Sequence, residues 1–135
     1  MRLMLDTNTC IFIIKRKPPE VLERFLHYGV GDIGISSITL SELRYGVAKS
    51  RKREKNAQAL DEFIAPLVMA SFDEGAAMAY GDVRYAPEKA GTPIGAMDML
   101  IAAHAMSLGI TLVTTNTREF SRIHRLEVVD WTANA

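Results

Sequence analysis

Short apolar segments alternate along this chain with longer stretches in which apolar residues recur every three or four positions. The short segments predict buried strands, and the longer ones predict amphipathic helices. Because strands separated by helices are joined by right-handed crossovers, this order favours a mostly parallel sheet. With 135 residues and no repeat or internal boundary, we expect one α/β domain over residues 1–135, a central mostly parallel sheet flanked by helices.

Periodicity and turn residues set the bounds of the expected elements. We expect strands at residues 3–5, 32–36, 67–69, 111–115 and 126–129. We expect helices at about residues 9–15, 19–28, 39–50, 54–64, 74–89, 97–108 and 117–122. Gly91, Pro93 and Gly95 predict a turn over residues 91–95, and residues 132–135 are expected to form a loose end.

The charges balance over the whole chain but not locally. Lys and Arg together number 16, and so do Asp and Glu, so the net charge neither favours nor excludes a nucleic-acid partner. Residues 44–58, however, contain six basic side chains against one acid, Glu54. Two interpretations of this run remain open: a solvated helix face, and a patch that faces phosphates or a protein partner.

The single cysteine and the N-terminal residues exclude several classes of protein. Cys10 cannot form an internal disulfide or a cysteine-based zinc cluster, and its apolar surroundings predict a buried thiol. The apolar run of residues 10–14 is far too short to span a membrane, and Asp6 interrupts any signal-peptide core. We therefore expect a cytoplasmic protein with no membrane partner.

Four acidic residues lie near predicted helix starts, and three of them follow a predicted strand. They are Asp6, Glu42, Asp98 and Glu119. Each has a purely structural interpretation. Asp6 can cap the helix that follows it, and the pairs Thr39–Glu42 and Asn116–Glu119 have the spacing of capping boxes.

The joint arrangement of these acids allows a second interpretation. In a parallel sheet the strand exits share one edge, so acids far apart in sequence would converge on one crevice. Two unit charges about 4 Å apart repel by about 4 kcal/mol at an effective dielectric near 20. Helix N-termini offset part of this cost, and a divalent cation would offset more; clustered carboxylates suit Mg2+ or Mn2+. From spacing alone, a shared metal site and separate helix caps remain equally open.

Four motifs in register resemble the PIN-domain toxins of VapBC toxin–antitoxin systems. They are "MLDTN" at the start, "ISSITLSELRYG" at residues 35–46, "GTPIGAMDMLIAAHA" at 91–105 and "LVTTNTREFSRI" at 112–123. The ending "VVDW" is also similar to that family. The resemblance runs in order over residues 3–131, nearly the whole chain.

The resemblance implies a PIN-like fold and a Mg2+-dependent endoribonuclease, with Mn2+ as a substitute ion. It implies the toxin component of a type II toxin–antitoxin system, neutralised by a cognate VapB antitoxin. It further suggests a homodimer and a larger toxin–antitoxin assembly on operator DNA. Among RNA substrates it favours tRNA, with the anticodon loop of the initiator tRNA as the leading candidate.

The resemblance also implies roles for individual residues. Asp6, Glu42 and Asp98 match the family's acidic triad, and Glu119 is chosen over Asn116 for a fourth catalytic position. Asp6 and Asp98 would be direct metal ligands, whereas Glu42 and Glu119 would hold a second ion or act through a water. Side chains expected to orient the carboxylates by hydrogen bonds are Thr7, Asn8, Ser37, Thr115 and Asn116. Side chains that could hold the RNA backbone are Arg84, Arg118 and Arg122, although solvated charge explains each of them equally well.

Two other functions fit parts of the pattern. A receiver-like signalling domain also has Asp at strand ends, but it needs an acidic pair after its first strand and a Lys after a late one, which this chain lacks. A PIN domain that cuts structured DNA would need more chain for gripping the duplex. The sequence contains no His–His or Lys–His pair of the kind that a cyclising nuclease uses. We expect His104 to be a core or helix-face residue, and His27 and His124 to lie on the surface.

Overall fold

The computed structural model describes residues 1–92 and 94–132 of the chain. Its strands are β1 (Leu3–Leu5), β2 (Ile33–Ser36), β3 (Val68–Ala70), β4 (Thr111–Val113) and β5 (Val128–Val129). Its helices are α1 (Thr7–Lys15), α2 (Pro19–Leu26), α3 (Ser37–Ala48), α4 (Arg53–Ile64), α5 (Glu74–Lys89), α6 (Ala96–Leu108) and α7 (Thr117–Phe120). The expected order of strands and helices is confirmed. Pro93 of the expected turn and residues 133–135 of the expected loose end lie outside the described residues.

The strands form one sheet in the order β3-β2-β1-β4-β5, and every neighbouring pair is parallel. The first strand of the chain therefore lies at the centre, and the order along the sheet reverses on either side of it. Open parallel sheets bind ligands at such a reversal, beyond the carboxyl ends of the strands. The expected α/β fold is confirmed, and the residues that follow β1, β2 and β4 lie at this edge.

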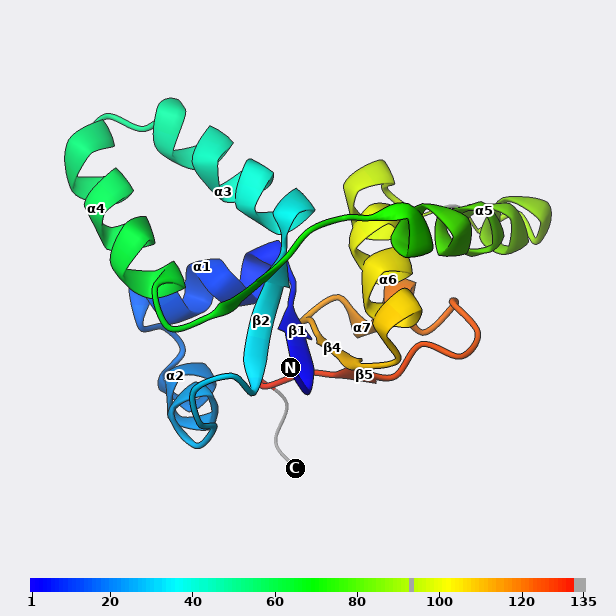
Figure 1. Ribbon diagram of the computed structural model, residues 1–135, viewed down its shortest axis with the longest axis horizontal. Helices are drawn as coiled ribbons and strands as arrows, with labels where there is room; N and C mark the ends of the chain where they lie inside the picture. Colours follow the sequence, from blue (N-terminus) through cyan, green and yellow to red (C-terminus); the bar gives the residue numbers. More distant parts are fainter. Residues whose placement is uncertain (93, 133–135) are drawn as a thin grey trace.

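Both faces of the sheet are covered, which explains why the strands contain almost no polar residues. Successive side chains of a strand point to opposite faces. Leu3 and Leu5 accordingly pack into the core under α1 to α4, whereas Met4 packs into the core under α5, α6 and α7. Figure 1 shows these two groups of helices on opposite sides of the sheet.

The backbones of β2 and β3 approach so closely at Gly34 that this position requires a glycine. Gly34 in β2 lies against β3, and a Cβ atom there would be 2.6 Å from the carbonyl oxygen of Val68. No larger residue fits unless the two strands move apart. Within the described residues, none of the helices combines the length and the apolar character needed to cross a membrane.

Candidate active site

Asp6 is fixed between the two central strands by hydrogen bonds. Its Oδ1 atom accepts from the backbone N–H of Thr9 at 2.9 Å, so Asp6 caps α1 as the capping interpretation predicts. Its own backbone N–H donates to the carbonyl of Val113 in β4 at 3.0 Å. The side chain is only 3% exposed. Such a carboxylate is held in one place, which suits a ligand as well as a cap.

Glu42 reaches this edge of the sheet from α3. The predicted capping box is wrong, because α3 begins at Ser37 and its cap is Ser36, whose Oγ accepts from the N–H of Ile38 at 3.1 Å. Glu42 is therefore in the second turn, free of any capping task. Its Oε1 atom accepts a hydrogen bond from the hydroxyl of Thr7 on α1. Thr7 therefore contacts one of the four acids, and its role in orienting that carboxylate stays a prediction.

Asp98 and Glu119 come from the first turns of two further helices. Asp98 is the third residue of α6, a position where the helix dipole favours a negative charge. Glu119 lies in the short helix α7, and its Oε2 accepts from the side-chain amide of Asn116 at 2.9 Å. The second predicted capping box is wrong as well, because the side chain of Asn116 makes no cap bond to the helix backbone. Asn116 contacts Glu119 instead, as a neutral partner of that carboxylate.

The four carboxylates act on one another electrostatically. The pKa of Asp98 is raised to about 6, first by burial and then by the negative charges of Asp6, Glu119 and Glu42. Burial is also the main cause that raises the pKa of Asp6, and the charge of Glu42 adds to it. Hydrogen bonds from Thr114 and Thr9 partly counteract this rise. The fold thus brings Asp6, at the cap of α1, near acids on α3, α6 and α7, and a metal site shared among them stays a prediction; we call this group the acidic crevice.

The donor set of the acidic crevice fits a hydrated, hard cation. Within residues 1–92 and 94–132, no group of three or more His, Cys, Asp or Glu side chains is placed so that it could hold a metal ion. Mg2+ does not need such a group, because it usually keeps several waters and binds through one or two carboxylates. Cys10 and His104, which could act as softer ligands, are engaged elsewhere. Cys10 is buried, and burial raises the pKa of its thiol well above the usual range. His104 forms a hydrogen bond with Ser36.

Two threonines were missed by reasoning from sequence. Thr114 is fully buried beside Asp6, and its hydroxyl accepts from the N–H of Asn116 at 2.9 Å. Thr9 contributes its backbone N–H to Asp6, and its hydroxyl donates to the carbonyl of Val113 at 3.2 Å. The signal for Thr9 was its spacing of three residues from a capping acid. Thr114 precedes the expected Thr115, and only the sheet decides which of the two faces Asp6.

Other expected site residues lie elsewhere or make other contacts. Ser37 accepts a hydrogen bond from the N–H of Phe72 at 3.0 Å, so its hydroxyl holds the segment after β3 rather than an acid. Asn8 is exposed. Arg84 is exposed on α5, where its guanidinium is 2.8 Å from Glu88 and 3.2 Å from the hydroxyl of Tyr80. Arg118 and Arg122 are exposed on and just after α7.

His104 belongs to the core, as expected. Its Nδ1 atom lies 2.7 Å from the hydroxyl of Ser36, and its ring meets Phe72 edge-on. Burial lowers the pKa of His104, which favours the neutral ring. The pair Ser36–His104 ties the start of α3 to α6 and thus the helix of Glu42 to the helix of Asp98. His27 and His124 are exposed, as expected.

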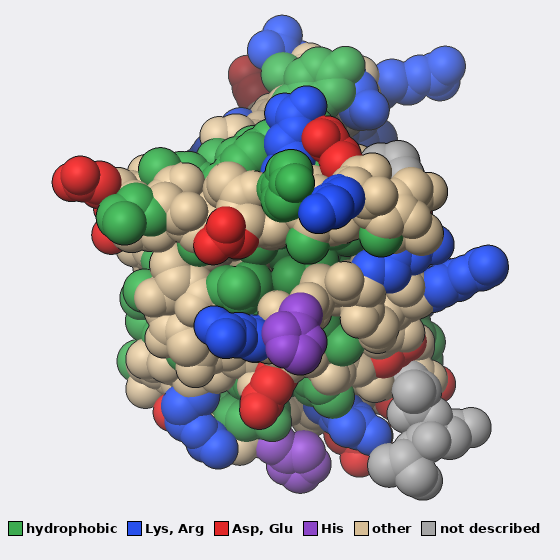
Figure 2. Space-filling model, turned by 90° about the vertical axis from the view of Figure 1, so that its right-hand side faces the viewer, with side chains coloured by type: hydrophobic (Ala, Val, Ile, Leu, Met, Phe, Trp, Pro, Cys, Tyr) green, Lys and Arg blue, Asp and Glu red, His purple; other side chains and the backbone are tan. Residues whose placement is uncertain are grey.

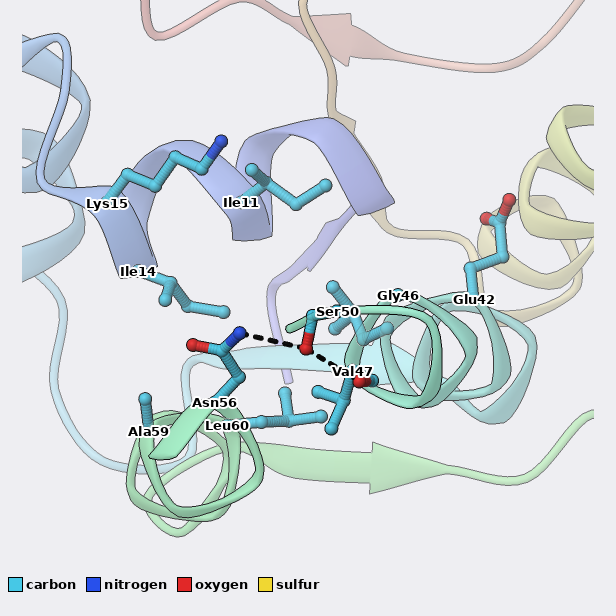
Figure 3. Close-up of a pocket in the computed structure, with 11 residues that line it drawn as sticks. Ile11, Ile14, Lys15, Glu42, Gly46, Val47, Ser50, Asn56, Ala59 and Leu60 are labelled. Atoms are coloured by element: carbon cyan, nitrogen blue, oxygen red, sulfur yellow. Dashed lines mark hydrogen bonds between the residues drawn. The ribbon is translucent and has the colours of Figure 1, made fainter. Parts of the chain in front are cut away.

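An apolar groove runs from Glu42 along α3. Figure 3 shows it between α1, α3 and α4, with Glu42 at one end and Asn56 and Ser50 joined by a hydrogen bond of 3.0 Å near the other. Its volume is about 380 Å³. Most of its wall is apolar, contributed by Ile11, Ile14, Leu43, Val47, Ala59 and Leu60.

Comparison with known proteins identifies the family. Residues 3–126 match the PIN domain family. The chain is 44% identical to the tRNA(fMet)-specific endonuclease VapC of Shigella flexneri, over 97% of this chain and 98% of that relative. It is 40% identical to ribonuclease VapC2 of Haemophilus influenzae strain Rd, with the same coverage of both chains.

Solved structures agree. The DNA-bound VapBC of Salmonella typhimurium is similar with a TM-score of 0.91 at 45% identity, over 97% of this chain and 98% of that chain. VapBC2 of Rickettsia felis, bound to a promoter DNA fragment, has a TM-score of 0.91 at 40% identity, over 97% and 99% of the two chains. Because the sequence match, the fold and the four converging acids agree over nearly the whole length, this chain belongs to the PIN domain family and, within it, to the VapC ribonucleases.

Proposed function

We propose that this protein is the toxin of a type II toxin–antitoxin pair, a cytoplasmic Mg2+-dependent endoribonuclease that hydrolyses tRNA and is neutralised by a VapB-type antitoxin. The observation that carries the proposal is the acidic crevice, in which burial first, and then the charges of Asp6, Glu119 and Glu42, raise the pKa of Asp98 to about 6. Full-length similarity to proteins named as VapC ribonucleases supports the same activity.

Asp6 and Asp98 would hold the ion, with Glu42 and Glu119 as further ligands, directly or through a water. When bound, Mg2+ supplies activation of a water and neutralisation of charge on the leaving oxygen. The chain's own residues place the ligands. Backbone and hydroxyl donors fix Asp6, Thr7 turns Glu42 toward the crevice, and Asn116 does so for Glu119.

The raised pKa of Asp98 links the site to pH. With a pKa near 6, Asp98 is mostly ionised at neutral pH and becomes protonated below pH 6 in the metal-free protein. A cation competes with that proton, because a carboxylate binds metal only after deprotonation. We therefore expect both metal affinity and RNA cleavage to fall as the pH drops through 6.

The choice of tRNA rests on the relatives. The Shigella flexneri protein is named for tRNA(fMet), and this chain matches it over nearly its whole length. Initiator tRNA is therefore the leading substrate, and the family resemblance favours a cut in its anticodon loop.

The apolar groove beside Glu42 is the proposed seat of the antitoxin. The Salmonella and Rickettsia relatives were solved as VapBC complexes on DNA, so an antitoxin partner and an assembly of dimers on operator DNA are proposed here too. An amphipathic helix suits a groove with apolar walls. A Lys or Arg of the antitoxin at the groove's end would meet Glu42 and block the acidic crevice through a charge-assisted bond.

Cleavage of tRNA by the purified protein tests the activity. We expect cuts in initiator tRNA with millimolar Mg2+ and none in excess EDTA, with the ends mapped by RNA sequencing. Brief induction in cells without the antitoxin should arrest growth and produce the same ends. Undiminished cleavage in EDTA would overturn the metal mechanism, and cuts confined to other RNAs would overturn the substrate.

Filling the groove tests the antitoxin. Gly46 lines the groove, and a Cβ atom there would meet nothing within 4 Å, so Gly46→Leu can begin a side chain at this point of the groove. We expect weaker antitoxin binding, measured by calorimetry, with tRNA cleavage unchanged. Antitoxin affinity equal to that of the unmodified protein would place the antitoxin elsewhere.

A further inference from the structure

The turn between α3 and α4 carries a concentration of positive charge that the acidic crevice does not explain. Over residues 49–55 the only acid is Glu54. The basic residues are Lys49, Arg51, Lys52, Arg53 and Lys55, and all five are exposed. We call this group the basic tip. It is a turn and the first residues of α4, so the solvated helix face considered from sequence describes only part of it.

The charges of the basic tip are not neutralised within the protein. In the part of the chain that the structure describes, the ion pairs are Arg2–Asp32, Arg44–Asp61 and Arg84–Glu88, and none includes a tip residue. Lys49 lies 4.9 Å from the ring centre of Tyr45, which is itself 66% exposed. By contrast, the face on the side of α5 and α6 mixes acidic and basic side chains (Figure 2).

The backbone adds to the positive field. Helix α4 begins at Arg53, and Lys52 at its cap position makes no side-chain cap bond. The first N–H groups of a helix and the positive end of its dipole favour anions. Here that end lies within the cluster of five cations, so both features attract phosphate in the same place.

The position of the basic tip suits a long polyanion that is cut at the acidic crevice. One helix, α3, carries Glu42 in its second turn and ends at the tip; seven residues at 1.5 Å rise separate Glu42 from Lys49 by about 10 Å. Figure 1 shows the α3–α4 turn projecting from the body at the far end of α3 from the sheet. The crevice itself repels phosphates, and the chain has a net charge of zero, so backbone affinity has to come from a local group of cations.

We propose that the basic tip binds the phosphate backbone of the RNA substrate at a distance from the scissile bond. This inference rests on the proposed RNA cleavage. The contacts are with phosphates, so they add affinity without reading sequence. A folded RNA such as tRNA presents phosphates at both places at once. The apolar groove lies between them and remains the seat of the antitoxin.

Charge neutralisation with a matched control tests the proposal. The test variant is Arg51→Gln/Lys52→Gln/Arg53→Gln, and the control is Arg2→Gln/Arg24→Gln/Lys89→Gln, which removes the same charge from exposed or half-exposed sites away from the tip. Steady-state cleavage of tRNA is measured from 50 to 200 mM salt. We expect the KM of the test variant to rise about tenfold, with kcat unchanged, and the KM of the control to stay within about twofold.

The salt dependence of binding makes the test sharper. With Asp98→Asn added to prevent cutting, tRNA affinity is measured against salt, and each lost phosphate contact lowers the slope by about 0.7 to 0.9. We expect the test variant to lose about two such contacts. A KM and slope equal to the control's would overturn the role of the tip. So would a variant that loses antitoxin binding but keeps its tRNA affinity, since the tip would then serve the antitoxin.

The two proposals fail separately. If the unmodified protein bound tRNA through the tip but cut no RNA with Mg2+, the proposed activity would be wrong and the tip would be supported. If it cut tRNA and the tip variant cut equally well at every salt concentration, the activity would be supported and the tip overturned.

Discussion

The two ends of α3 hold opposite charges in opposite surroundings. At the sheet end, Glu42 joins three partly or fully buried acids, Asp6, Asp98 and Glu119. Thr7 donates a hydrogen bond to Glu42, Thr9 to Asp6 and Asn116 to Glu119. At the far end, the basic tip holds five exposed cations with no ion-pair partner among the described residues. The same helix thus connects a crowded, buried cluster of like charge with a crowded, solvated one.

The difference shows what burial does to like charges. Two charges about 4 Å apart repel by about 4 kcal/mol at an effective dielectric near 20, but by about 1 kcal/mol in water. The acidic crevice therefore costs stability, because burial first and the neighbouring acids second disfavour the charged form of Asp98 and raise its pKa. A bound cation would offset that cost. In the solvated basic tip, repulsion between the cations costs little stability, so the cluster persists without a bound polyanion. Five predictions test the two ends of α3, from the largest expected effect to the smallest.

Removing one charge from the acidic crevice should nearly abolish activity. We expect Asp98→Asn to lower tRNA cleavage by at least about 1,000-fold, because electrostatic and metal-assisted stabilisation of the transition state is worth several kcal/mol. Asp6→Asn should behave alike. The matched control is Asp82→Asn, an exposed acid on α5, and far-ultraviolet circular dichroism checks the fold. Equal loss in the control, or full activity in Asp98→Asn, would contradict the role of the crevice.

Replacing Ser36, the buried cap of α3, should lower the stability of the protein more than replacing its neighbour Ser37. Ser36→Ala removes the helix cap and leaves the Nδ1 atom of His104 without its buried partner. We expect a loss of about 2 kcal/mol in the free energy of unfolding. Ser37→Ala removes only the acceptor for Phe72 N–H and should cost about 1 kcal/mol. Equal losses in urea unfolding would mean that the Ser36–His104 contact adds nothing.

The substitution Asp98→Asn should stabilise the metal-free protein. The pKa of Asp98 is about 6 when folded and about 3.9 when unfolded, so ionised Asp98 disfavours the folded state. This cost is absent below about pH 4, grows between pH 4 and 6, and is complete above 6. At pH 7.5 in EDTA we expect Asp98→Asn to be more stable by about 1 kcal/mol, less than the whole pKa shift corresponds to because solvent screens the half-buried Asp98. Urea unfolding measures the difference, which should vanish towards pH 4.

Bound Mg2+ should reverse the stability advantage that Asp98→Asn has in the metal-free protein. An ion that binds only the native state raises the melting temperature, so millimolar Mg2+ should stabilise the unmodified protein more than Asp98→Asn. If the variant were less stable in EDTA and both proteins shifted equally with Mg2+, the acids would be separate helix caps with no shared site.

Neutralising the basic tip should hardly change stability. For Arg51→Gln/Lys52→Gln/Arg53→Gln we expect a change within about 0.5 kcal/mol, because exposed charges without partners contribute little. Thermal melts at low and high salt check this, and any small gain should disappear at high salt as repulsion is screened. A loss above 1 kcal/mol would show that these side chains hold the α3–α4 turn together.

Local patterns were enough to predict the elements, but from spacing alone they left a shared acidic site and separate helix caps equally open. The short, wholly apolar run of β1 and the three- and four-residue spacing in α3 to α6 follow from burial and backbone geometry, so they can be read from neighbouring residues. The start of α3 was misplaced by two residues, because Ser36, Ser37 and Thr39 are all good caps by residue type. Only the packed structure shows that Ser36 takes the cap while Thr39 is buried in the helix.

The sequence by itself determined that a parallel α/β sheet would carry acids at its carboxyl edge, since both follow from hydrophobic period and from what stands after each strand. The tertiary structure decided which hydroxyl meets which carboxylate: Thr7 with Glu42, 35 residues apart, and Thr114 rather than Thr115 beside Asp6. It also decided that the pKa of Asp98 rises to about 6. These facts depend on how the helices pack on the sheet order β3-β2-β1-β4-β5, because burial and repulsion act through space and not along the chain.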